Sequence, residues 1–582
     1  MLSLANESDK QPYNGKTGMR ITKIIFNSDY LKGPSEIELK NLTILVGPNN
    51  SGKSQSLKDI ENWYVPSHPG PMPTIPKMKL IKSIETDLPK NYDELLDFVT
   101  LFKTDPPRNP PSNSQSDDIN YSIIDPRGGS GNSLVLRIKE LRNQPFTYTP
   151  ESALRFLQNH NITKGCCVRL DSETRFALTK DKPRGDILQA PQNLLAYLFQ
   201  RDDVAIKLRQ IINVEFDRFF YLDPTRGGDS LKIVMSLTSN PNPKSLEKQY
   251  AEFFRNADLL EGLGDGIKTF TGLLLAAVNP QYKIILIDDP EAFLHPPKAY
   301  SLGRYLSSLV IERDGTLIVG THSSDFLMGC LDTTSMLTII RLTYDGSKGT
   351  IRRLEAKDVL TLAHDPLLRS TNVMDALFHG SAIVVEGDVD RVFYSEINRK
   401  LLLDRQGIPD VLFIKAIGKD TIHRIVVQLR KIGIPTAFIY DLDIIRKRNH
   451  DKLWQNVLNA ANIPLESQTY FEGERKFFDE KIPRGDSDSD VIKLRGFCDL
   501  SDTDKIRADV FLKRLQEFGV FVVPIGEVER WLSYLYKGDD RGWLQNILET
   551  LESPLVKPSD DDVWKFLTEI RLWITNNNRL GM

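Results

Sequence analysis

Short apolar runs separated by polar turns recur along the chain, and their order predicts alternating strands and helices. The first strands are expected at MRITKIIF (19–26) and at IELKNLTILV (37–46), which runs straight into a glycine-rich loop at Gly47. A strand–helix–strand pattern follows between 262 and 321. Strands that alternate with helices form parallel sheets, so this pattern predicts an α/β fold.

Other stretches of the same half predict different local structures. The segment CVRLDSETRFALT (167–179) indicates a hairpin, with two apolar-rich strands around a polar turn. Residues 193–260 are expected to be mostly helical, interrupted by the loop DPTRGGDS at 223–230. The run at 104–117 is rich in Pro, Ser and Asn and has no periodicity, which is typical of a surface loop.

The pattern changes between about 350 and 378, and a second α/β unit begins at Ser381. Apolar runs at AIVVE, VLFIKAIG and PTAFIYDLD are separated by helical patterns, and GVFVVPIGEVE follows later. This order predicts parallel strands with right-handed crossovers. The charge-dense segment 473–504 contains GDSDSD and is expected to be an exposed, mobile insertion.

Composition limits the class of protein. The chain has 582 residues, which suggests about two to four domains. Apolar residues make up 40% and charged residues 26%, as in ordinary globular proteins. The net charge of −3 gives no global basic field, so contact with nucleic acid would need local patches.

The cysteines, the N-terminal sequence and the length of the apolar runs indicate where the protein is located. The four cysteines lack the spacing of a zinc site and suit a reducing cytosol. The N-terminal sequence MLSLANESDKQPYNGK is polar and mixed in charge, which argues against a signal peptide. No apolar run reaches the ~18 to 20 residues of a membrane helix. We therefore expect a cytoplasmic protein without a membrane partner.

The stretch GPNNSGKS (47–54) fits the pattern G-x-x-x-x-G-K-[ST]. It follows the apolar strand LTILV and precedes a helical pattern, which is the context that a phosphate-binding loop requires. Backbone N–H groups of such a loop surround phosphate oxygens, the lysine reaches the outer phosphates and the hydroxyl ligates Mg²⁺. The predicted ATP-binding residues are Gly47, Asn50, Gly52, Lys53 and Ser54.

A second acidic strand, KIILIDDPE (283–291), supports an ATPase. Asp288 is expected to help hold Mg²⁺, and Asp289 stands where a base would orient the attacking water. His322 follows the strand LIVGT and is a candidate γ-phosphate sensor, although a lone histidine is more often structural. The segment LGDGIKT (263–269) opens a helix and offers an anion site, with candidate nucleotide contacts at Gly264, Gly266 and Lys268.

Together, the loop at 47–54, the 263–269 element, the acidic strand and His322 resemble the ABC-type ATPase core of SMC and RecF proteins. In that family the 263–269 element acts on ATP bound by the partner protomer, so the resemblance implies a homodimer or a higher even oligomer. Two departures matter. In this chain Gly264 stands where that element usually has a serine, and Asp265 stands where it has its first glycine. Asp289 stands where the family usually has the catalytic Glu. They favour slow hydrolysis, with ATP acting more as a switch than as fuel.

Several strand ends of the second unit carry acids. Glu386 ends the first strand, Asp390 begins the next helix, and Asp441 and Asp443 end the third strand; Glu527 or Glu529 follows the last one. Parallel strands share one carboxyl edge, so these acids should converge there. Converging like charges need cations, and all-oxygen ligands favour Mg²⁺ or Mn²⁺, two of which would clamp a phosphodiester. The simpler interpretation of each acid alone is a solvated strand end or a helix-start acid.

This pattern resembles a Toprim domain, with a Glu after the first strand and D-x-D after the third. The stretch Glu386-Gly-Asp-Val-Asp-Arg391 is similar to the E-G-x-x-D-R element of the OLD (overcoming lysogenisation defect) nucleases. Those proteins join an N-terminal ABC ATPase to a C-terminal Toprim domain, and the resemblance covers about 19 to 535. It implies metal ligands at Glu386, Asp390, Asp441, Asp443 and Glu529. Of these, Glu386, Asp441 and Asp443 are also expected to be catalytic. It also implies a late lysine near the metals, for which Lys557 and Lys565 are weak matches.

The resemblance also gives the expected domain order. A flexible N-terminus (1–18) precedes an ABC-type ATPase domain (19–370), with a helical dimerisation insert at about 193–260. A Toprim nuclease domain (380–535) contains the charged insertion at about 473–504. A C-terminal helical segment (536–582) follows.

Local positive charge would have to hold DNA. Arg446, Lys447 and Arg448 follow the D-x-D pair, and Arg391 stands beside Asp390, so these side chains are candidates for phosphate contacts. A solvated loop is an equally good interpretation of the basic run. No zinc finger, aromatic stacking motif or base-reading helix indicates sequence-specific recognition.

The sequence thus predicts an ATP-binding and ATP-hydrolysing, Mg²⁺- or Mn²⁺-dependent DNA endonuclease that forms no covalent intermediate. The resemblance implies a role in bacterial anti-phage defence, under the control of a partner protein or a reverse-transcribed DNA in some relatives. One alternative is a Toprim topoisomerase or primase, but Tyr440 is on the wrong side of its strand end to be a nucleophile, and no primase zinc motif is present. The other alternative is an ATP-gated DNA clamp of the RecF/SMC type with an inactive Toprim domain.

Overall fold

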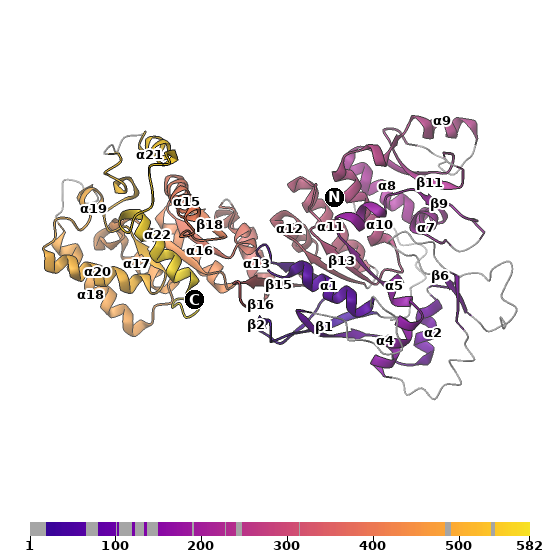
Figure 1. The fold of residues 1–582 in the computed structure, drawn as a ribbon, viewed down its shortest axis with the longest axis horizontal. Coiled ribbons are helices and arrows are strands. Elements are labelled where there is room, and N and C mark those ends of the chain that lie inside the picture. The colour runs from indigo at the N-terminus through magenta and orange to yellow at the C-terminus, as the bar shows by residue number, and fades with distance from the viewer. Residues whose placement is uncertain are drawn as a thin grey trace. The chain divides into compact units, whose positions relative to one another are not determined.

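The computed structural model describes residues 19–65, 79–100, 102–103, 119–122, 133–136, 149–188, 191–226, 228–239, 247–312, 315–369, 371–482, 490–536 and 542–582. Four predictions lie outside these residues: the flexible N-terminus, the loop at 104–117, most of GDSDSD, and the side chains of Lys447 and Arg448. The chain forms two compact units, of which the second comprises 46–51, 341–344 and Leu354–Met582, and the first the rest (Figure 1).

The first unit is built on a mixed sheet whose described strands follow the order β2-β16-β15-β4-β14-β13-β8. Its parallel centre consists of β4 (Leu42–Val46), β14 (Thr316–Gly320), β13 (Ile284–Asp288) and β8 (Cys167–Leu170). The outer strands are β15 (Leu337–Tyr344), β16 (Gly349–Leu354) and β2 (Leu31–Lys32). Every residue of β4 and β14 is buried, which explains their uninterrupted apolar sequences.

Helices follow the central strands and place the ends of these strands at one edge of the sheet. They are α1 (Lys53–Tyr64) after β4, α11 (Pro296–Glu312) after β13 and α12 (Ser324–Thr333) after β14, whereas α10 (Asp265–Val278) precedes β13. The α/β prediction and the expected strand–loop–helix context of GPNNSGKS are confirmed. Elsewhere in this unit lie α2 (Tyr92–Thr100), β6 (Ile119–Ser122), β7 (Ser133–Leu136), α4 (Pro150–Asn159), α5 (Ile162–Cys166) and β9 (Lys182–Pro183).

The expected single strand at 37–46 is two strands in two sheets. The first, β3 (Glu36–Glu38), pairs with β1 (Arg20–Phe26) in an antiparallel sheet that β5 (Ile81–Asp87) completes. The second is β4. Between them the Lys40 N–H donates to the Thr338 hydroxyl at 3.0 Å and the Asn41 carbonyl accepts from the Leu317 N–H at 2.7 Å, so the chain changes sheets at these polar residues.

The predicted hairpin at 167–179 is wrong, because only its first half is a strand. Residues Ser172–Ala177 form the helix α6. Asp171 follows β8 and caps this helix, since its carboxylate accepts from the N–H groups of Glu173 at 3.1 Å and Thr174 at 3.0 Å. The Thr174 hydroxyl in return accepts from the Asp171 N–H at 2.8 Å. Such a cap contributes about 1 kcal/mol and starts a helix within a run that otherwise alternates like a strand.

The segment 193–260 is helical only in part. The helices α7 (Leu194–Gln200), α8 (Asp202–Phe216) and α9 (Lys248–Asn256) are accompanied by an antiparallel sheet of β10 (Phe219–Asp223), β11 (Ser230–Ser236) and β12 (Asp258–Leu259). The sequences FFYLD and SLKIVMS are rich in aromatic and β-branched residues, which favour strands. Tyr221, Val234 and Phe254 form a small core here.

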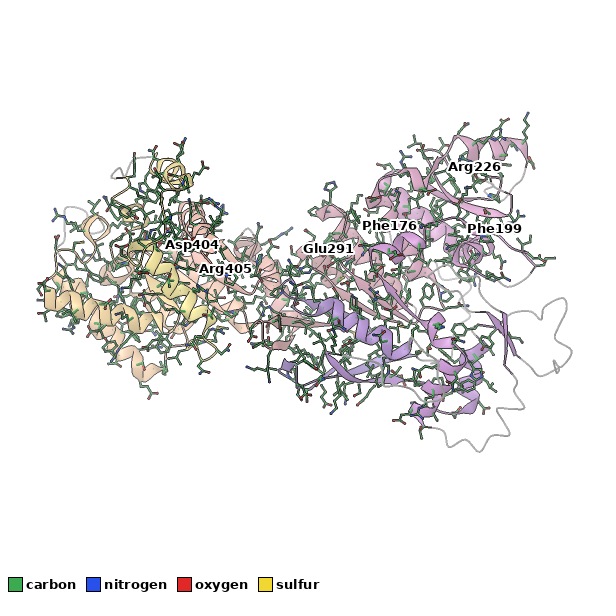
Figure 2. All side chains as sticks on the ribbon, viewed as in Figure 1. Phe176, Phe199, Arg226, Glu291, Asp404 and Arg405 are labelled. Atoms are coloured by element: carbon green, nitrogen blue, oxygen red, sulfur yellow. The ribbon has the colours of Figure 1, made fainter. Side chains whose placement is uncertain are left out.

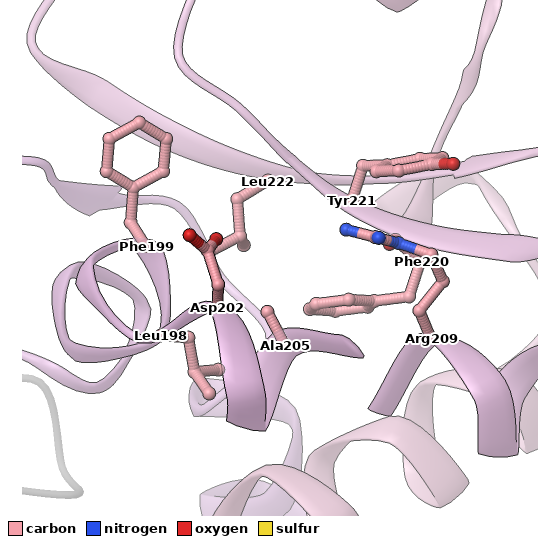
Figure 3. A pocket seen from close by; sticks show the side chains of 8 residues that line it. All are labelled: Leu198, Phe199, Asp202, Ala205, Arg209, Phe220, Tyr221 and Leu222. Atoms are coloured by element: carbon pink, nitrogen blue, oxygen red, sulfur yellow. The ribbon is translucent and has the colours of Figure 1, made fainter. Parts of the chain in front are cut away.

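A cavity of ≈ 20 Å³ lies between α8 and β10 of this segment (Figure 3). The Arg209 guanidinium lies 4.4 Å from the centre of the Tyr221 ring, and its Nε donates to the Phe220 carbonyl at 3.2 Å. None of the residues that line the cavity is a predicted site residue. We therefore regard it as a packing defect of the segment.

The second unit has a sheet whose described strands follow the order β18-β17-β19-β20 and are all parallel. They are β17 (Ser381–Val385), β18 (Val411–Lys415), β19 (Thr436–Tyr440) and β20 (Val520–Val522). The helices α15 (Asp388–Leu403) and α16 (Lys419–Lys431) connect the first three. The predicted parallel strand–helix alternation from Ser381 onward is confirmed.

The C-terminal helices share the hydrophobic core of this unit. Trp543 of α21 (Trp543–Glu552) and Trp564 of α22 (Asp562–Thr575) are buried in one cluster with Ile383 and Phe393. Nearer the chain end, the buried Arg430 donates to the carbonyl oxygens of Gly581, Phe518 and Thr436. The segment 536–582 is thus part of the second unit, and so are α13 (Ala356–His364), α14 (Pro366–Arg369) and the 3₁₀ turn Val373–Phe378.

The described residues of 473–504 are not uniformly exposed as predicted, because several of them are buried, while the predicted mobility stays a prediction. They form the end of α18 (Leu465–Lys481), the helix α19 (Asp490–Arg495) and the start of α20 (Asp502–Gln516); α17 (Lys447–Ala460) precedes them. The charges are used internally: Glu474 is buried and pairs with Arg507 at 2.8 Å, and the buried Arg475 donates to the Ile445 and Arg446 carbonyls. Among the described helices none is long and apolar enough to cross a membrane.

Candidate ATP site and candidate metal centre

The glycines of the loop at 47–54 are required by its backbone. Gly47 has φ +140°, and a Cβ there would lie 1.9 Å from the Leu342 carbonyl oxygen. Gly52 has φ +98°, and its Cβ would lie 2.6 Å from Leu80 Cδ1. Asn50 also has a left-handed backbone, with φ +59°. These conformations are those of a tight loop that turns its N–H groups toward a bound anion.

The loop serine and the acidic strand meet, as the sequence predicted. The Ser54 hydroxyl donates to Asp288 Oδ1 at 2.9 Å. Burial raises the pKa of both Asp288 and Asp289, and the Lys53 ammonium opposes this rise at Asp289. A hydroxyl and a carboxylate at hydrogen-bond distance, beside a buried lysine, form an oxygen donor set that fits Mg²⁺ bound to a nucleotide. Ser54 and Asp288 would hold that ion.

His322 lies beside Asp289, and its backbone is held by a glutamate that the sequence analysis did not single out. Its Nε2 is 3.8 Å from Asp289 Oδ1. Glu291, marked in Figure 2, accepts from the His322 N–H at 2.6 Å and from the Thr321 hydroxyl at 2.8 Å. Glu291 thereby fixes the turn after β14, and its place two residues after Asp289 was the signal available for it.

Arg175 of α6 holds the turn that carries the two aspartates. Its fully buried guanidinium donates to the backbone carbonyls of Asp288 at 2.5 Å and Asp289 at 3.0 Å. Its Nε donates to the Asp171 carbonyl at 2.9 Å. Asp289 has φ +48°, an unusual conformation that these contacts stabilise. The sequence analysis missed Arg175 because it placed the residue in a hairpin.

The 263–269 element opens a helix at the expected place. Gly264 is the N-cap of α10 and is exposed, and no atom lies within 4 Å of the position that its Cβ would take. The Lys268 ammonium lies 3.3 Å from Asp265 Oδ1. The first turn of α10, which includes Gly266, carries free N–H groups, as every helix start does. Whether these residues contact nucleotide stays a prediction.

Five acids of the second unit, which we call the acidic edge, follow the carboxyl ends of parallel strands. Glu386 comes directly after β17, Asp441 directly after β19, and these strands pair in register through Val384 and Phe438. Asp443 lies in the 3₁₀ turn Leu442–Ile445, and Glu529 in the 3₁₀ turn Val528–Arg530 that follows β20. Asp390 completes the set from the first turn of α15.

The charges of the acidic edge act on one another. Burial, followed by the like charges of Asp443 and Asp390, raises the pKa of Glu386 to about 7, against the attraction of Lys419. Burial and the charges of Glu386, Asp390 and Asp443 raise the pKa of Asp441 well above its usual range. Burial also raises the pKa values of Asp390 and Glu529. The structure therefore brings the predicted acids into one electrostatic group.

Individual members of this group differ in their contacts. Asp390 Oδ2 accepts from the Gly387 N–H at 2.9 Å, so this acid also caps α15. Glu527 lies 3.6 Å from the Lys493 ammonium, whereas the charge of Glu529 acts on Asp390. The charge of Glu527 also raises the pKa of Glu529, so both late glutamates lie in the surroundings of the acidic edge.

Two lysines at the acidic edge were missed by the sequence analysis. The Lys419 ammonium lies 2.5 Å from Asp443 Oδ2. At Lys493 burial lowers the pKa, but Asp443, Asp441, Glu527 and Glu386 together raise it. Lys493 arrives on α19, which packs so closely that a Cβ on Gly526 (φ +116°) would lie 1.9 Å from the Lys493 carbonyl oxygen. Lys557 and Lys565, the two lysines considered from sequence, are exposed.

The donor chemistry of the acidic edge fits a hard divalent cation. All candidate ligands are carboxylate oxygens, and Glu386 Oε1 and Asp443 Oδ1 are buried without a hydrogen-bond partner. In the described part of the chain, however, no three His, Cys, Asp or Glu side chains are already arranged to hold a metal ion. Glu386, Asp441 and Asp443 would hold the ion after their side chains turn toward it.

The basic run after the D-x-D pair is not a uniform DNA-facing surface. Arg446 is buried, and its guanidinium donates to the Ile482 carbonyl at 3.2 Å and lies 3.5 Å from Asp479 Oδ1. The prediction of a phosphate contact is therefore wrong for Arg446, because α18 covers it. Arg391 is 42% exposed and lies 3.3 Å from Asp388, so it stays accessible to an anion. Tyr440 is fully buried, and its hydroxyl donates to the Lys419 carbonyl at 3.3 Å, which fits a structural role.

Fold and sites together define the class: a P-loop ATPase unit of ABC type joined to a Toprim unit. The family described as "Overcoming lysogenization defect protein-like, TOPRIM domain" matches residues 377–443, which include Glu386, Asp390, Asp441 and Asp443. The Old nuclease of Escherichia phage P2 is 25% identical over 268 residues, 42% of each chain. The second unit is thus similar to the Toprim domain of the OLD family over residues 377–443.

Other similarities are shorter or weaker. Protein ea59 of Escherichia phage lambda is 40% identical over 60 residues, 10% of this chain and 11% of that protein. The chain thus matches less than half the length of either relative. An SMC head bound to a winged-helix domain of ScpA has 12% identity and a TM-score of 0.36, and covers 59% of this chain and 99% of its own. The Thermotoga maritima SMC head has 16% identity and a TM-score of 0.27, and covers 58% of this chain and all of its own. At these scores the fold of the first unit rests on its own strand order and loop.

Proposed function

We propose that the protein is a divalent-metal-dependent DNA endonuclease whose activity is controlled by ATP. The observation that carries the proposal is the convergence of Glu386, Asp441 and Asp443 at the carboxyl edge of one parallel sheet, where burial and the neighbouring acids raise the pKa values of Glu386 and Asp441. Bound Mg²⁺ or Mn²⁺ would supply a Lewis acid for the phosphodiester oxygens. The named relative from phage P2, a nuclease, supports the same chemistry.

The residues of the chain would then divide the work. Glu386, Asp441 and Asp443 bind the cation, and Asp390 and Glu529 are further candidate ligands. Arg391 is exposed beside this group and can meet a phosphate of the nucleic acid. In the ATP site, Lys53 and Ser54 hold the phosphates and Mg²⁺, while Asp289 orients the attacking water beside His322. Gly264, Gly266 and Lys268 would complete the ATP site of a second protomer.

The direct test is nicking of supercoiled plasmid in Mg²⁺ or Mn²⁺, with and without ATP. We expect wild-type protein to nick and Asp441→Ala to lose at least about a hundred-fold in rate, the range seen when a group that acts in the transition state is removed. Lys53→Ala should lose ATP turnover and keep metal binding at the acidic edge. If wild-type protein fails to cut in every nucleotide state, the nuclease proposal is wrong.

A non-nucleolytic, ATP-gated DNA clamp is the second candidate. It is favoured by one observation: among the described residues no acid group is prearranged for a metal ion. Such a clamp would bind DNA in an ATP-dependent way that Lys53→Ala removes and Asp441→Ala leaves intact. We also propose a role in defence against phage, under the control of a partner protein or a reverse-transcribed DNA. The test of this role is whether cells that carry Asp441→Ala lose protection against phage.

A further inference from the structure

Lys419 occupies an unusual position for a lysine. It is the first residue of α16, after the turn at Gly418 (φ +79°) that ends the β18 connection. A positive charge at a helix N-terminus is opposed by the helix dipole. The opposing effect is offset by Asp443, because Lys419 Nζ lies 2.5 Å from Asp443 Oδ2. The Asp443 side chain is only 6% exposed and that of Lys419 20% exposed, so this ion pair is shielded from water.

The same ammonium also serves Glu386. The attraction of the Lys419 ammonium lowers the pKa of Glu386, against burial and the charges of Asp443 and Asp390, which raise it. Lys419 is therefore a shared counter-ion for two acids that come from different strand ends. Without it, Glu386 and Asp443 would repel each other across a buried space.

Each of these two acids keeps one oxygen unused. Asp443 gives Oδ2 to Lys419, while its Oδ1 is buried without a hydrogen-bond partner. Glu386 Oε1 is buried and unpartnered as well. Buried oxygens without partners are costly, at ~1 to 3 kcal/mol each, and are rare in folded proteins. Their presence beside a lysine indicates a place built for more positive charge than one ammonium supplies.

We propose that the Lys419 ammonium is a built-in cation that holds Asp443 and Glu386 in the metal-free protein, and that a divalent ion must displace it. This inference rests on the proposed function, because it assumes that the acidic edge binds metal. It explains why the acids form an electrostatic group while no metal-binding arrangement is present among the described residues. Displacement would also release a positive charge next to the metal, where a phosphate could take it up.

The neighbouring Lys415 offers a matched control. It ends β18, four residues before Lys419, and its ammonium lies 2.6 Å from Asp388 Oδ2. This pair has a similar length, but its side chains are 42% and 56% exposed, and Asp388 is not part of the acidic edge. Exposed pairs of this kind contribute little. Loss of Lys415 thus removes a lysine of the same type without removing the proposed built-in cation.

The test is a titration of metal-free, nucleotide-free full-length protein with Mn²⁺, followed by electron paramagnetic resonance of the free ion. Variants are Lys419→Met, Lys419→Arg, Lys415→Met and Asp441→Ala, and the sites that Asp441→Ala removes define the acidic edge. An opposite charge at this distance changes the proton affinity of a carboxylate by about one to three powers of ten, so we expect Lys419→Met to bind Mn²⁺ at least about ten-fold more tightly. Lys415→Met and Lys419→Arg should stay within about two-fold of wild type, as expected when the competing charge is unchanged.

Thermal unfolding keeps the test valid if Lys419→Met folds poorly without metal. In chelator this variant should melt below wild type, and Mn²⁺ should raise its melting temperature by more than that of wild type. Equal or weaker Mn²⁺ binding by Lys419→Met, with wild-type binding intact, overturns this inference and leaves the proposed function standing. Absence of Asp441-dependent Mn²⁺ binding in wild type and in Lys419→Met overturns both.

Discussion

At the scale of single residues, the carboxylates of the acidic edge lower the stability of the fold but suit a functional site. Glu386 is partly buried beside like charges, and both effects raise its pKa to about 7. Asp443 is buried as well but has Lys419 at 2.5 Å. Carboxylates placed together at such a cost in free energy are typical of functional sites. The unpartnered Oε1 of Glu386 marks it as the residue whose ionisation should be most visible in stability.

The stability of the metal-free protein should therefore depend on pH through Glu386. The folded pKa of about 7 lies above the usual 4.5, so the folded state binds the proton more tightly than the unfolded state. This contribution is fully present below pH ~4.5 and is lost as the pH rises through ~7, which lowers the free energy of unfolding by on the order of 3 kcal/mol. Chemical unfolding in chelator between pH 4.5 and 8 measures it.

Glu386→Gln is the comparison for that measurement, because it cannot ionise. Its stability should fall less over the same pH window than that of wild type. Asp441 shares the effect, so some pH dependence should remain in the variant. Parallel curves for wild type and variant would contradict the raised pKa of Glu386.

At the scale of elements, periodicity predicted the parallel strands but not the elements that depend on caps or distant contacts. Runs such as LTILV and TAFIY are buried throughout, so their sequence alone indicates a central strand. The helix α6 depends on the Asp171 cap, and α19 on its close packing against Gly526. Arg175 lies on α6 and Lys493 on α19. Because neither helix was predicted from the sequence, neither residue was predicted as part of a site. Lys419 was missed for another reason: its partner Asp443 is 24 residues away.

The helix α6 yields a prediction of its own. We expect Arg175→Met to lower the free energy of unfolding by on the order of 3 kcal/mol, because the carbonyls of Asp171, Asp288 and Asp289 lose a buried donor. ATP turnover should fall more than ATP affinity, since the turn that carries Asp289 is released while the loop at 47–54 is retained. Steady-state ATPase assays together with nucleotide titration separate the two effects.

Arg184→Met is the control for this element. Arg184 forms a partly exposed ion pair with Asp229 at 3.5 Å in the same unit and has no contact with the aspartate turn. Its stability should change by less than about 1 kcal/mol. A folded Arg175→Met protein with wild-type turnover would show that the guanidinium is not needed to position Asp289.

At the scale of the whole molecule, the chain carries two acid pairs with different surroundings. Asp288 and Asp289 lie in the first unit beside the loop lysine and a serine hydroxyl. Asp441 and Asp443 lie in the second unit with Glu386 and two lysines. The first set suits a metal bound to nucleotide and the second a metal bound to a nucleic-acid backbone. In the proposed dimer, the 263–269 element of a second protomer would add the start of its helix to the first set.

Gly264 tests this dimeric arrangement, because the space around it is empty. No atom lies within 4 Å of its Cβ position and its backbone is not left-handed, so Gly264→Trp should fold and dimerise normally while blocking the contact of the 263–269 element with the partner's ATP. Alone, Gly264→Trp and Lys53→Ala should each lose ATP turnover. Mixed in equal amounts, random dimers should recover about one quarter of wild-type turnover, since half of them hold one intact composite site of two. Gly473→Trp, at an equally open and exposed glycine, should leave ATP turnover unchanged. Failure of the mixture to recover, with both variants folded and dimeric, would show that the 263–269 element does not act on the partner's ATP.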